Sequence, residues 1–544
     1  MRSPAYAWLL LLGCSQQAQP SSMLVDVDGP QPSPVTFSCD ETAGAEPEGL
    51  RRLTMTQYKN TVRDLTRWAL GGALEADVIV TLAGLDAVPL DRGRLDQALE
   101  QIHVDETFRV ATALGSALSA PERLGSVAGP CAVDQNATND DACIGDFINR
   151  FGARALRRPL DAEDVTFYRV VYGGSSTATP AAFGDVITVM LSSPELLYFV
   201  EHGVAQLADK RGRYALSAHE LAARLSYHFW QTLPDDALWQ AADDGSLLEP
   251  AVLEREVDRL LADPRARATM AELFGDWLGL DDLPSSELRE HAIDEALDML
   301  AYYTWTNPAG VAALFTSELS FARSAELAQL YGIEPWDGVA TPPSFASDER
   351  PGLLTRAWFL ASGALSTRPI QRGVRIRRKL LCDDLAPPPA NVAAMLPSPA
   401  AGKTTRQAIE ELTEQPGTSC AACHASFINP LGFAFEGFDA LGRARSEQGA
   451  LAVDTHTVPR ITPSDERASS GPAELTALMI ESGKLEACLA RSYFRFTFGR
   501  IEDVAVDGCA LERLRARLAD TGRIRDMLRE AALLPEMRER RIEP

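Results

Sequence analysis

One pentapeptide, Cys420-Ala421-Ala422-Cys423-His424, places two thiols and an imidazole within five residues. On a helix, positions i, i+3 and i+4 lie on one face, so all three side chains would project from one turn. This spacing is typical of covalent c-type haem attachment, in which both sulfurs bond the haem and His424 ligates the iron. The alternatives are a redox dithiol, a disulfide or half of a zinc site. No βαβ setting or second Cys-x-x-Cys supports them, so we predict one covalent haem c.

The amino terminus indicates export, which c-type haem requires. Arg2 gives a short positive region, and Ala5 to Leu12 form an apolar stretch too short to span a bilayer. The following Leu11-Leu12-Gly13-Cys14 resembles the lipobox of bacterial lipoproteins. We therefore expect a signal peptide over 1–13 and lipidation of Cys14, with a buried first helix as the alternative. Lipid-anchored localisation in the bacterial envelope, with outer-membrane sorting permitted by Ser15, follows from this resemblance. No other apolar run is long enough for a membrane helix.

Six cysteines remain once Cys14 is assigned to lipid and two thiols to haem. An even remainder in an exported chain suggests disulfides. The expected pairs are Cys131–Cys143, Cys488–Cys509 and, by elimination, Cys39–Cys382. Spacing does not fix connectivity, and buried free thiols are the alternative.

Composition limits the class of protein. With 544 residues and 46% hydrophobic residues, the chain can bury several cores. Its formal net charge of −24 repels nucleic acid and anionic surfaces, so we exclude DNA or RNA binding. No Gly-x-Ser-x-Gly, phosphate loop or dinucleotide fingerprint occurs either, so hydrolase and nucleotide chemistry have no support.

Hydrophobic periodicity predicts an all-α fold of several modules. Thr54 to Gln57 and Ser217 to Glu220 have the capping-box form and precede apolar residues at helical spacing. Asp161 is a third candidate cap. Near the end, an apolar stripe at 511–518 is broken by Gly522 before a second stripe begins. Pro- and Gly-rich stretches near 337–352 and 386–402 mark expected boundaries.

Five stretches carry a more specific pattern: Arg52 to Leu65, Phe151 to Pro159, Tyr214 to Pro234, Arg350 to Arg443, and Tyr493 to Arg500. In content and order they resemble the planctomycete-type, multi-module cytochrome c-like envelope proteins, which are built from serial domains of unknown function. One departure is Asn429, which stands before Pro430-Leu431-Gly432 where the family usually has aspartate. The expected segments are a signal peptide 1–13, a tether 14–49, helical modules 50–112, 113–205 and 212–340, a haem module 348–447 and a C-terminal helical module 470–544.

The sixth iron ligand would set the reduction potential, because methionine raises it and a second histidine lowers it. The candidates are His456, Met479 and Met395. Each has an alternative: His456 lies in a polar stretch and would be solvated, and Met479 has the spacing of a core residue.

Two further groups of side chains need an interpretation. Arg372 and Arg375 belong to a basic cluster at 368–379, and could bind haem propionates as bidentate donors. A solvated helix or ion pairs with nearby acids is the favoured alternative. His219 and His228 lie nine residues apart, on opposite faces of a helix, so we interpret them as structural.

Two functions fit these features. The first is a lipid-anchored monohaem cytochrome that passes electrons to a redox partner protein, with membrane contact only through its lipid. The second is a surface scaffold, with polysaccharide as the suggested partner and a structural or sensory haem. Any enzymatic role, such as an electron carrier beside an oxidoreductase, is left open.

Overall fold

The computed structural model describes residues 30–40, 49–208, 212–346, 350–386 and 402–542. Helix accounts for 58% of the residues and strand for 5%, which confirms the all-α prediction. The chain divides into two compact units. Unit 1 contains residues 1–39, 271–493 and 507–527, and unit 2 contains residues 40–270, 494–506 and 528–544. No helix of the described residues is long and apolar enough to cross a membrane.

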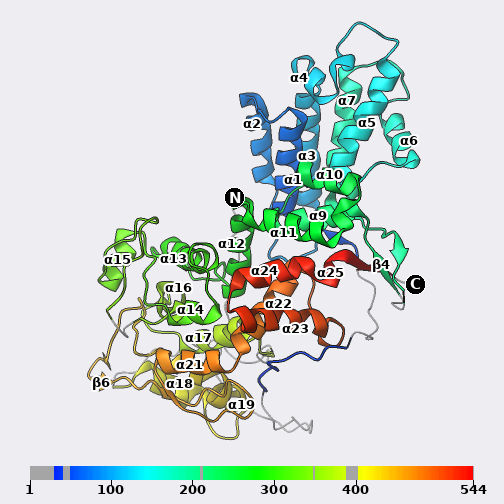
Figure 1. Cartoon of the computed structure of the whole chain (residues 1–544). Helices are drawn as coiled ribbons and strands as arrows, with labels where there is room; N and C mark the ends of the chain where they lie inside the picture. The colour runs from blue at the N-terminus through cyan, green and yellow to red at the C-terminus, as the bar shows by residue number, and fades with distance from the viewer. Residues whose placement is uncertain (1–29, 41–48, 209–211, 347–349, 387–401, 543–544) are drawn as a thin grey trace, which may run out of the picture. The chain divides into compact units, whose positions relative to one another are not determined.

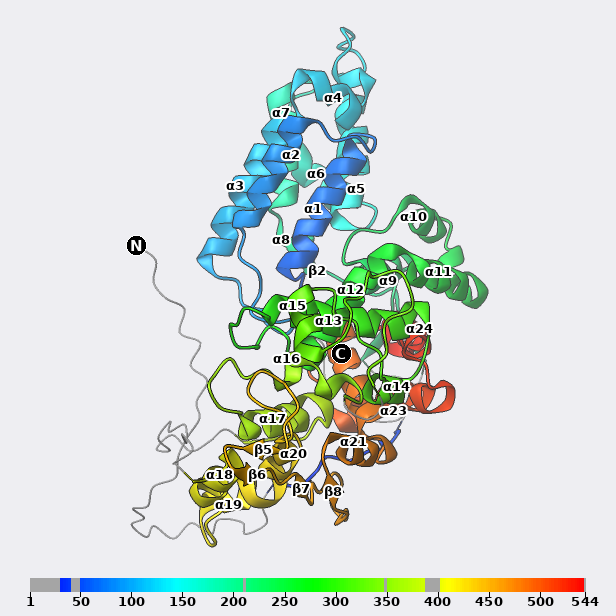
Figure 2. The ribbon, with the colours of Figure 1, turned by 90° about the vertical axis from the view of Figure 1, so that its left-hand side faces the viewer.

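Unit 2 is built around a group of long helices, of which α1, α3, α5 and α7 lie alongside one another (Figures 1 and 2). Its helices are α1 Met55–Ala69, α2 Ala76–Ala83, α3 Gln101–Leu118, α4 Pro121–Val127, α5 Asp140–Leu156, α6 Ala162–Val171, α7 Pro180–Leu191, α8 Pro194–Leu197, α9 Ala218–Trp230, α10 Asp236–Asp243, α11 Pro250–Ala262 and α25 Pro535–Arg538. The 3-10 turns are η1 Gly84–Ala87, η2 Pro130–Ala132 and η3 Ser246–Leu248.

Local sequence explains where these helices begin. Thr54, Asp161 and Ser217 each cap a helix, as predicted. The capping boxes expected at Thr54 and Ser217 are present, and Asp161 forms a third. In the core, α3 and α7 cross at Gly115 and Gly184. A Cβ atom on Gly115 would lie 2.5 Å from the Gly184 carbonyl oxygen, so this close crossing requires glycine.

Short antiparallel strands complete unit 2. One pair joins β1 Arg51–Arg52 to β2 Tyr198–Phe199. A three-stranded sheet has the order β3-β4-β9, formed by Ala205–Gln206, Arg213–Ala215 and Glu539–Arg541. This sheet brings the carboxyl-terminal strand against the segment before α9.

Unit 1 holds the pentapeptide. Its helices are α13 Arg289–Ala301, α14 Val311–Thr316, α15 Ala325–Tyr331, α16 Ala357–Leu360, α17 Pro369–Arg375, α18 Thr405–Thr413, α19 Ser419–Cys423, α20 Asn429–Phe433 and α21 Pro472–Glu481. Three π-helical turns, η4 Tyr302–Thr306, η6 Ile376–Leu380 and η7 His424–Ile428, and the 3-10 turn η5 Leu353–Thr355 join them. The strand pairs are β5 Glu447–Gln448 with β6 Leu451–Ala452, and β7 His456–Thr457 with β8 Ser469–Ser470.

Four helices contain residues of both units: α12 Pro264–Leu278, α22 Lys484–Phe498, α23 Val504–Thr521 and α24 Ile524–Leu533. The predicted break at Gly522 falls between α23 and α24, where the glycine has a φ of +62°. The two apolar stripes are buried as expected.

The disulfides differ in part from the expected connectivity. Cys131 pairs with Cys143, as predicted. The predictions Cys488–Cys509 and Cys39–Cys382 are wrong, because the structure pairs Cys39 with Cys509 and Cys382 with Cys488. Elimination failed here because each pair joins segments remote in sequence, 470 and 106 residues apart. Sequence spacing carries no information about such contacts.

Residues 30–39, which fall in the expected tether over 14–49, belong to unit 1. The Ser33 amide and hydroxyl donate to Asp383 Oδ1 over 2.7 and 3.0 Å. Phe37 is buried, and Cys39 forms the disulfide with Cys509. The polar composition of this segment does not predict that one phenylalanine and one disulfide attach it to the unit. The expected signal peptide and Cys14 lie outside the described residues.

Candidate functional site

The pentapeptide forms a helical turn that continues directly into a π turn. Thr418 caps α19 and accepts a hydrogen bond from the Ala421 amide over 3.2 Å. Cys420 and Cys423 therefore lie within one turn, and His424 opens η7. None of the residues 419–423 is buried. The motif is thus presented on an accessible turn and contributes little to the core of unit 1.

Two glycines fix the helices behind this turn. A Cβ atom on Gly373 of α17 would lie 2.1 Å from the Ile428 carbonyl oxygen, and one on Gly432 of α20 would lie 1.9 Å from the Pro369 carbonyl oxygen. Both contacts are too close for any side chain, so α17 packs directly against η7 and α20. The segment that follows His424 is therefore held in place by backbone contact.

His424 is oriented by Asn429. Its Nδ1 lies 3.0 Å from Asn429 Oδ1. The Asn429 amide nitrogen donates to Thr413 Oγ1 over 3.0 Å and to Glu414 Oε1 over 2.7 Å, which leaves Oδ1 facing the ring. Nδ1 must then carry the proton and donate, so the lone pair of the neutral ring is on Nε2. Metal-ligating histidines usually show this pattern, with one nitrogen hydrogen-bonded to the protein and the other facing the metal.

The electrostatics of the turn favour a neutral ligand over a redox nucleophile. Burial lowers the pKa of His424, and the hydrogen bond with Asn429 opposes this only in part. Burial raises the pKa of the Cys423 thiol, which disfavours the thiolate that redox dithiols need. Among the described residues Cys423 is the free cysteine, and Cys420 is held in a disulfide. Because one sulfur cannot keep that disulfide and also bond a haem vinyl group, the two states exclude each other.

The predicted sixth ligands have different surroundings. His456 is exposed in β7, and its Nδ1 lies 3.3 Å from the Ser470 hydroxyl. Met479 is fully buried in α21, as its core alternative requires. Met395 lies outside the described residues. The polar partner that the structure brings to His424 is Asn429, so the sixth ligand stays a prediction.

The predicted propionate ligands make internal contacts. Arg372 is buried and donates to the carbonyl oxygens of Phe435 and Leu360 over 3.0 and 2.7 Å, with Glu436 at 3.6 Å. Burial lowers the pKa of Arg372 to about 10. Arg375 is half-buried beside Trp358. These contacts match the ion-pair alternative for Arg372, while a propionate role stays a prediction for both.

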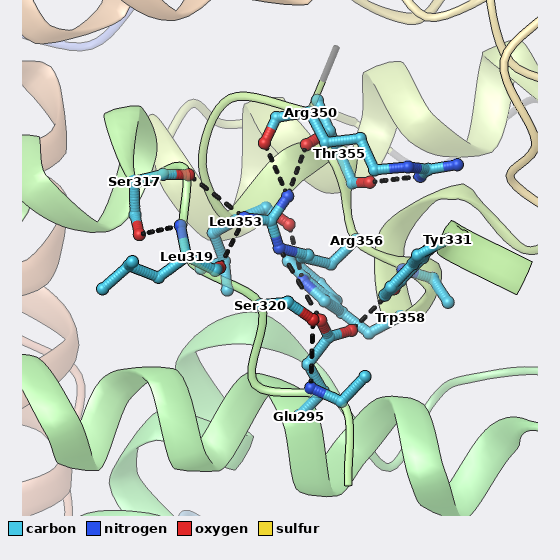
Figure 3. Close-up of polar contacts among 12 residues, drawn as sticks. Glu295, Ser317, Leu319, Ser320, Tyr331, Arg350, Leu353, Thr355, Arg356 and Trp358 are labelled. Atoms are coloured by element: carbon cyan, nitrogen blue, oxygen red, sulfur yellow. Dashed lines mark hydrogen bonds and ion pairs between the residues drawn. The ribbon is translucent and has the colours of Figure 1, made fainter. Parts of the chain in front are cut away.

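A second polar cluster in unit 1 surrounds Arg356 and is fully buried (Figure 3). Arg356 Nε lies 3.7 Å from Glu295 Oε1, and its other nitrogens donate to backbone oxygens of the loops around it. The Tyr331 hydroxyl donates to Glu295 Oε2 over 2.6 Å and accepts from the Ala357 amide over 2.7 Å. Burial raises the pKa of Glu295, against the opposing charge of Arg356. The cluster joins the start of the 350–358 segment to α13 and α15.

The two histidines of α9 lie in separate surroundings, as their spacing predicted. His219 Nε2 lies 2.8 Å from Asp243 Oδ1, and its ring packs edge-on against Trp239. His228 is buried, and desolvation followed by the charges of Arg94 and Arg51 lowers its pKa to about 3. It is therefore neutral throughout the physiological range.

Sequence reasoning missed the role of Asn429. In the sequence this residue is conspicuous only as a departure before Pro-Leu-Gly, although it is fully buried and joins α18, η7 and α20. The available signal was a polar residue inside the apolar run Phe427-Ile428-Asn429-Pro430-Leu431. Such a residue needs hydrogen-bond partners, and His424 is the titratable side chain nearest to it in the sequence.

Comparison with protein families places both clusters of unit 1 in a known series. Residues 143–201 match the family described as "PSD5: Protein of unknown function (DUF1595)", residues 216–333 match "PSD4: Protein of unknown function (DUF1592)", and residues 350–448 match "PSCyt3: Protein of unknown function (DUF1588)". The chain carries this serial set of domains. They are the domains of the planctomycete-type cytochrome c-like family, which confirms that part of the resemblance. The pentapeptide lies within the third match. No curated protein and no solved structure matches the chain.

The surroundings of the pentapeptide fit a haem in two respects. The turn is accessible, and Nε2 of His424 carries the lone pair that iron needs. Within the described ranges, no group of three or more His, Cys, Asp or Glu side chains is arranged to hold a metal ion.

Proposed function

We propose that the chain is a c-type haem protein of the bacterial envelope that acts in electron transfer or in another haem-dependent redox step. The observation that carries this proposal is the accessible Cys-x-x-Cys-His turn with His424 oriented through Asn429. Cys420 and Cys423 would hold the haem covalently, and His424 would ligate its iron. A bound haem supplies one-electron chemistry between ferric and ferrous iron.

The chain's own residues would define the environment of that iron. Asn429 Oδ1 accepts a hydrogen bond from Nδ1 of His424 and so increases the basicity of the imidazole, which favours the ferric state. The glycine contacts behind η7 hold the backbone that follows His424. Anchoring through Cys14 and a redox partner protein belong to the same proposal.

The test is a pyridine haemochrome spectrum of the denatured full-length protein, produced in a host with c-type maturation. We expect one covalent haem per chain and none in a Cys420→Ser/Cys423→Ser variant. The matched control is Cys131→Ser/Cys143→Ser, which removes the same number of sulfurs from unit 2 and should keep its haem.

Mass spectrometry without reduction separates the two states of Cys420. Haem adducts on both motif cysteines are expected in the matured protein. An intact disulfide at Cys420 and no covalent haem, with a control cytochrome matured in the same cells, would overturn the proposal.

A further inference from the structure

Unit 2 contains a cavity that the haem proposal does not use. Its volume is about 340 Å³, within the range of small-molecule sites. The wall includes β1, β2, α9 and β9, the end of α22 with the turn after it, and the segment that holds Arg94. All of these lining residues belong to unit 2. The cavity is therefore formed by segments hundreds of residues apart, so no local sequence pattern predicts it.

The charge of this wall is opposite to that of the chain. Two acidic side chains, Glu201 and Asp503, line the cavity. The lining arginines are Arg51, Arg94, Arg224, Arg500, Arg540 and Arg541. Over the whole sequence, 76 acidic residues outnumber 52 basic ones, so an excess of arginine at one cavity is a local exception. Such a wall concentrates anions.

Glu201 interacts with at least three of the six arginines, Arg224, Arg51 and Arg540. Arg224 binds it through two hydrogen bonds of 2.6 Å, and Arg540 Nη1 lies 3.9 Å from Glu201 Oε2. Burial raises the pKa of Glu201, but the charge and hydrogen bonds of Arg224 outweigh this, so the net pKa is lowered and the carboxylate is charged. The six arginines thus share the wall with two carboxylates, Glu201 and Asp503.

Neutral groups help to orient two of the arginines, Arg51 and Arg94. Arg51 Nη1 donates to the Thr497 carbonyl oxygen over 2.9 Å, and its guanidinium lies 4.2 Å from the Phe199 ring centroid. Arg94 donates to the Phe496 carbonyl oxygen over 3.0 Å and to Gln231 Oε1 over 2.8 Å. Neutral acceptors orient a guanidinium without cancelling its charge.

Two further observations agree with a positive, prearranged wall. The charges of Arg94 and Arg51 contribute to the lowered pKa of His228, which also lines the cavity. Gly499 has a φ of +63°, and a Cβ atom there would lie 2.8 Å from Arg51 Cδ. A side chain at 499 would therefore displace Arg51 from the wall.

From this geometry we infer that the cavity binds a small organic anion through a carboxylate or phosphate group. Arginine presents parallel N–H donors that match both groups. Phe199, Tyr227 and Phe498 supply aromatic surface beside the arginines for the rest of the ligand. This inference stands independently of haem attachment, because it uses no residue of the pentapeptide.

Isothermal titration calorimetry on the full chain tests the inference with citrate, inorganic phosphate and galacturonate, and with galactose as the uncharged match to galacturonate. We expect saturable binding of at least one anion at one site per chain, and none of galactose. Citrate alone would indicate a compact carboxylate ligand, phosphate alone a phosphorylated one, and galacturonate an acidic sugar.

Variants locate the binding. Arg51→Gln and Arg94→Gln should each lower the affinity for the anion at least tenfold, because a charged hydrogen-bonding partner is lost. The matched control is Arg467→Gln, which replaces an exposed arginine of unit 1. This variant should bind the anion with the affinity of the unaltered protein. If either cavity variant is less stable than the unaltered protein, the affinity of Arg500→Gln is measured instead. In the unaltered protein, Arg500 donates to the neighbouring Ile501 carbonyl oxygen.

Two results would overturn the inference. The first is no saturable binding of any of the three anions at physiological ionic strength. The second is an equal loss of affinity in Arg467→Gln and in the cavity variants, since this would indicate general charge screening.

Discussion

Two regions of unit 1, the cluster around Arg356 and the turn of the pentapeptide, differ in the burial of their polar side chains. Around Arg356 the guanidinium, the Glu295 carboxylate and the Tyr331 hydroxyl are buried and bonded to one another or to the backbone. In α19, by contrast, no residue is buried, although the turn contains two cysteines and leads into a histidine. The first region holds the fold together, whereas the second is positioned by the fold and contributes little to it.

This difference separates structural from chemical roles without reference to function. A polar group whose partners all belong to the protein can be exchanged only at the expense of stability. A reactive group on an accessible turn can be exchanged with little effect on folding, so its presence needs a chemical explanation. The four predictions below test this contrast, ordered by their expected effect on stability.

The largest effect is expected for Arg356→Met. It leaves the Glu295 carboxylate buried without its arginine, which typically costs about 3–5 kcal/mol of unfolding free energy. The matched control is Arg323→Met. The half-exposed ion pair of Arg323 with Asp298 should contribute about 1 kcal/mol or less to the unfolding free energy. Urea denaturation measures both.

Two additional measurements sharpen this prediction. Adding Glu295→Gln to Arg356→Met should recover part of the stability, because the unpaired charge is removed. The folded fraction of Arg356→Met should carry as much haem as the unaltered protein. Equal destabilisation by Arg356→Met and Arg323→Met would contradict the structural role of the cluster.

The sequence predicts the helices and their caps better than it predicts the contacts of buried polar side chains. Thr54, Asp161 and Ser217 were identified as caps because capping depends on residues three or four apart. The Cys131–Cys143 pair is also predicted, because its two cysteines lie only 12 residues apart. The Arg356 cluster, Cys39–Cys509 and the cavity arginines join segments remote in sequence, so their contacts follow from tertiary packing alone. Asn429 lies between these cases, since it is local to His424 but also contacts α18.

The second prediction extends the contrast to a buried histidine. His228 has a pKa of about 3 in the folded protein, below the ordinary value of 6.5, so the unfolded chain binds the extra proton between these values. Stability from this group is therefore complete above about pH 6.5 and falls by about 1.4 kcal/mol for each pH unit toward pH 3.

The measurement for His228 is a pair of stability curves from pH 7 to 4.5. Relative to His228→Gln, the unaltered protein should lose stability as the pH falls. The difference between the two proteins isolates His228 from the many carboxylates that also titrate. A difference that does not change with pH would show that His228 is not a buried neutral base.

The third prediction concerns Asn429, which belongs to both regions because it is buried but faces the accessible turn. Asn429→Leu leaves His424 Nδ1 and Glu414 without their partner and should cost about 1–3 kcal/mol. In the haem-loaded protein it should also raise the reduction potential, because a less basic imidazole stabilises ferric iron less.

Asn429→Asp is the conservative comparison, since aspartate keeps an oxygen acceptor for His424 Nδ1. Redox titration should give a potential at or below that of the unaltered protein for Asn429→Asp and above it for Asn429→Leu. The same potential in both variants would show that Asn429 supports the fold but does not position the ligand.

The smallest effect on stability, and the clearest chemical one, is expected for Cys423→Ser. Cys423 is a half-buried free cysteine, so its replacement should change the unfolding free energy of the haem-free chain by about 0.5 kcal/mol or less. The haemochrome band should nevertheless move to longer wavelength, because one vinyl group stays conjugated with the porphyrin when only Cys420 can bond. An unchanged spectrum would mean that Cys423 is not an attachment point. A loss of stability comparable to that of Arg356→Met would mean that the motif turn is part of the core, and the contrast between the two regions would fail.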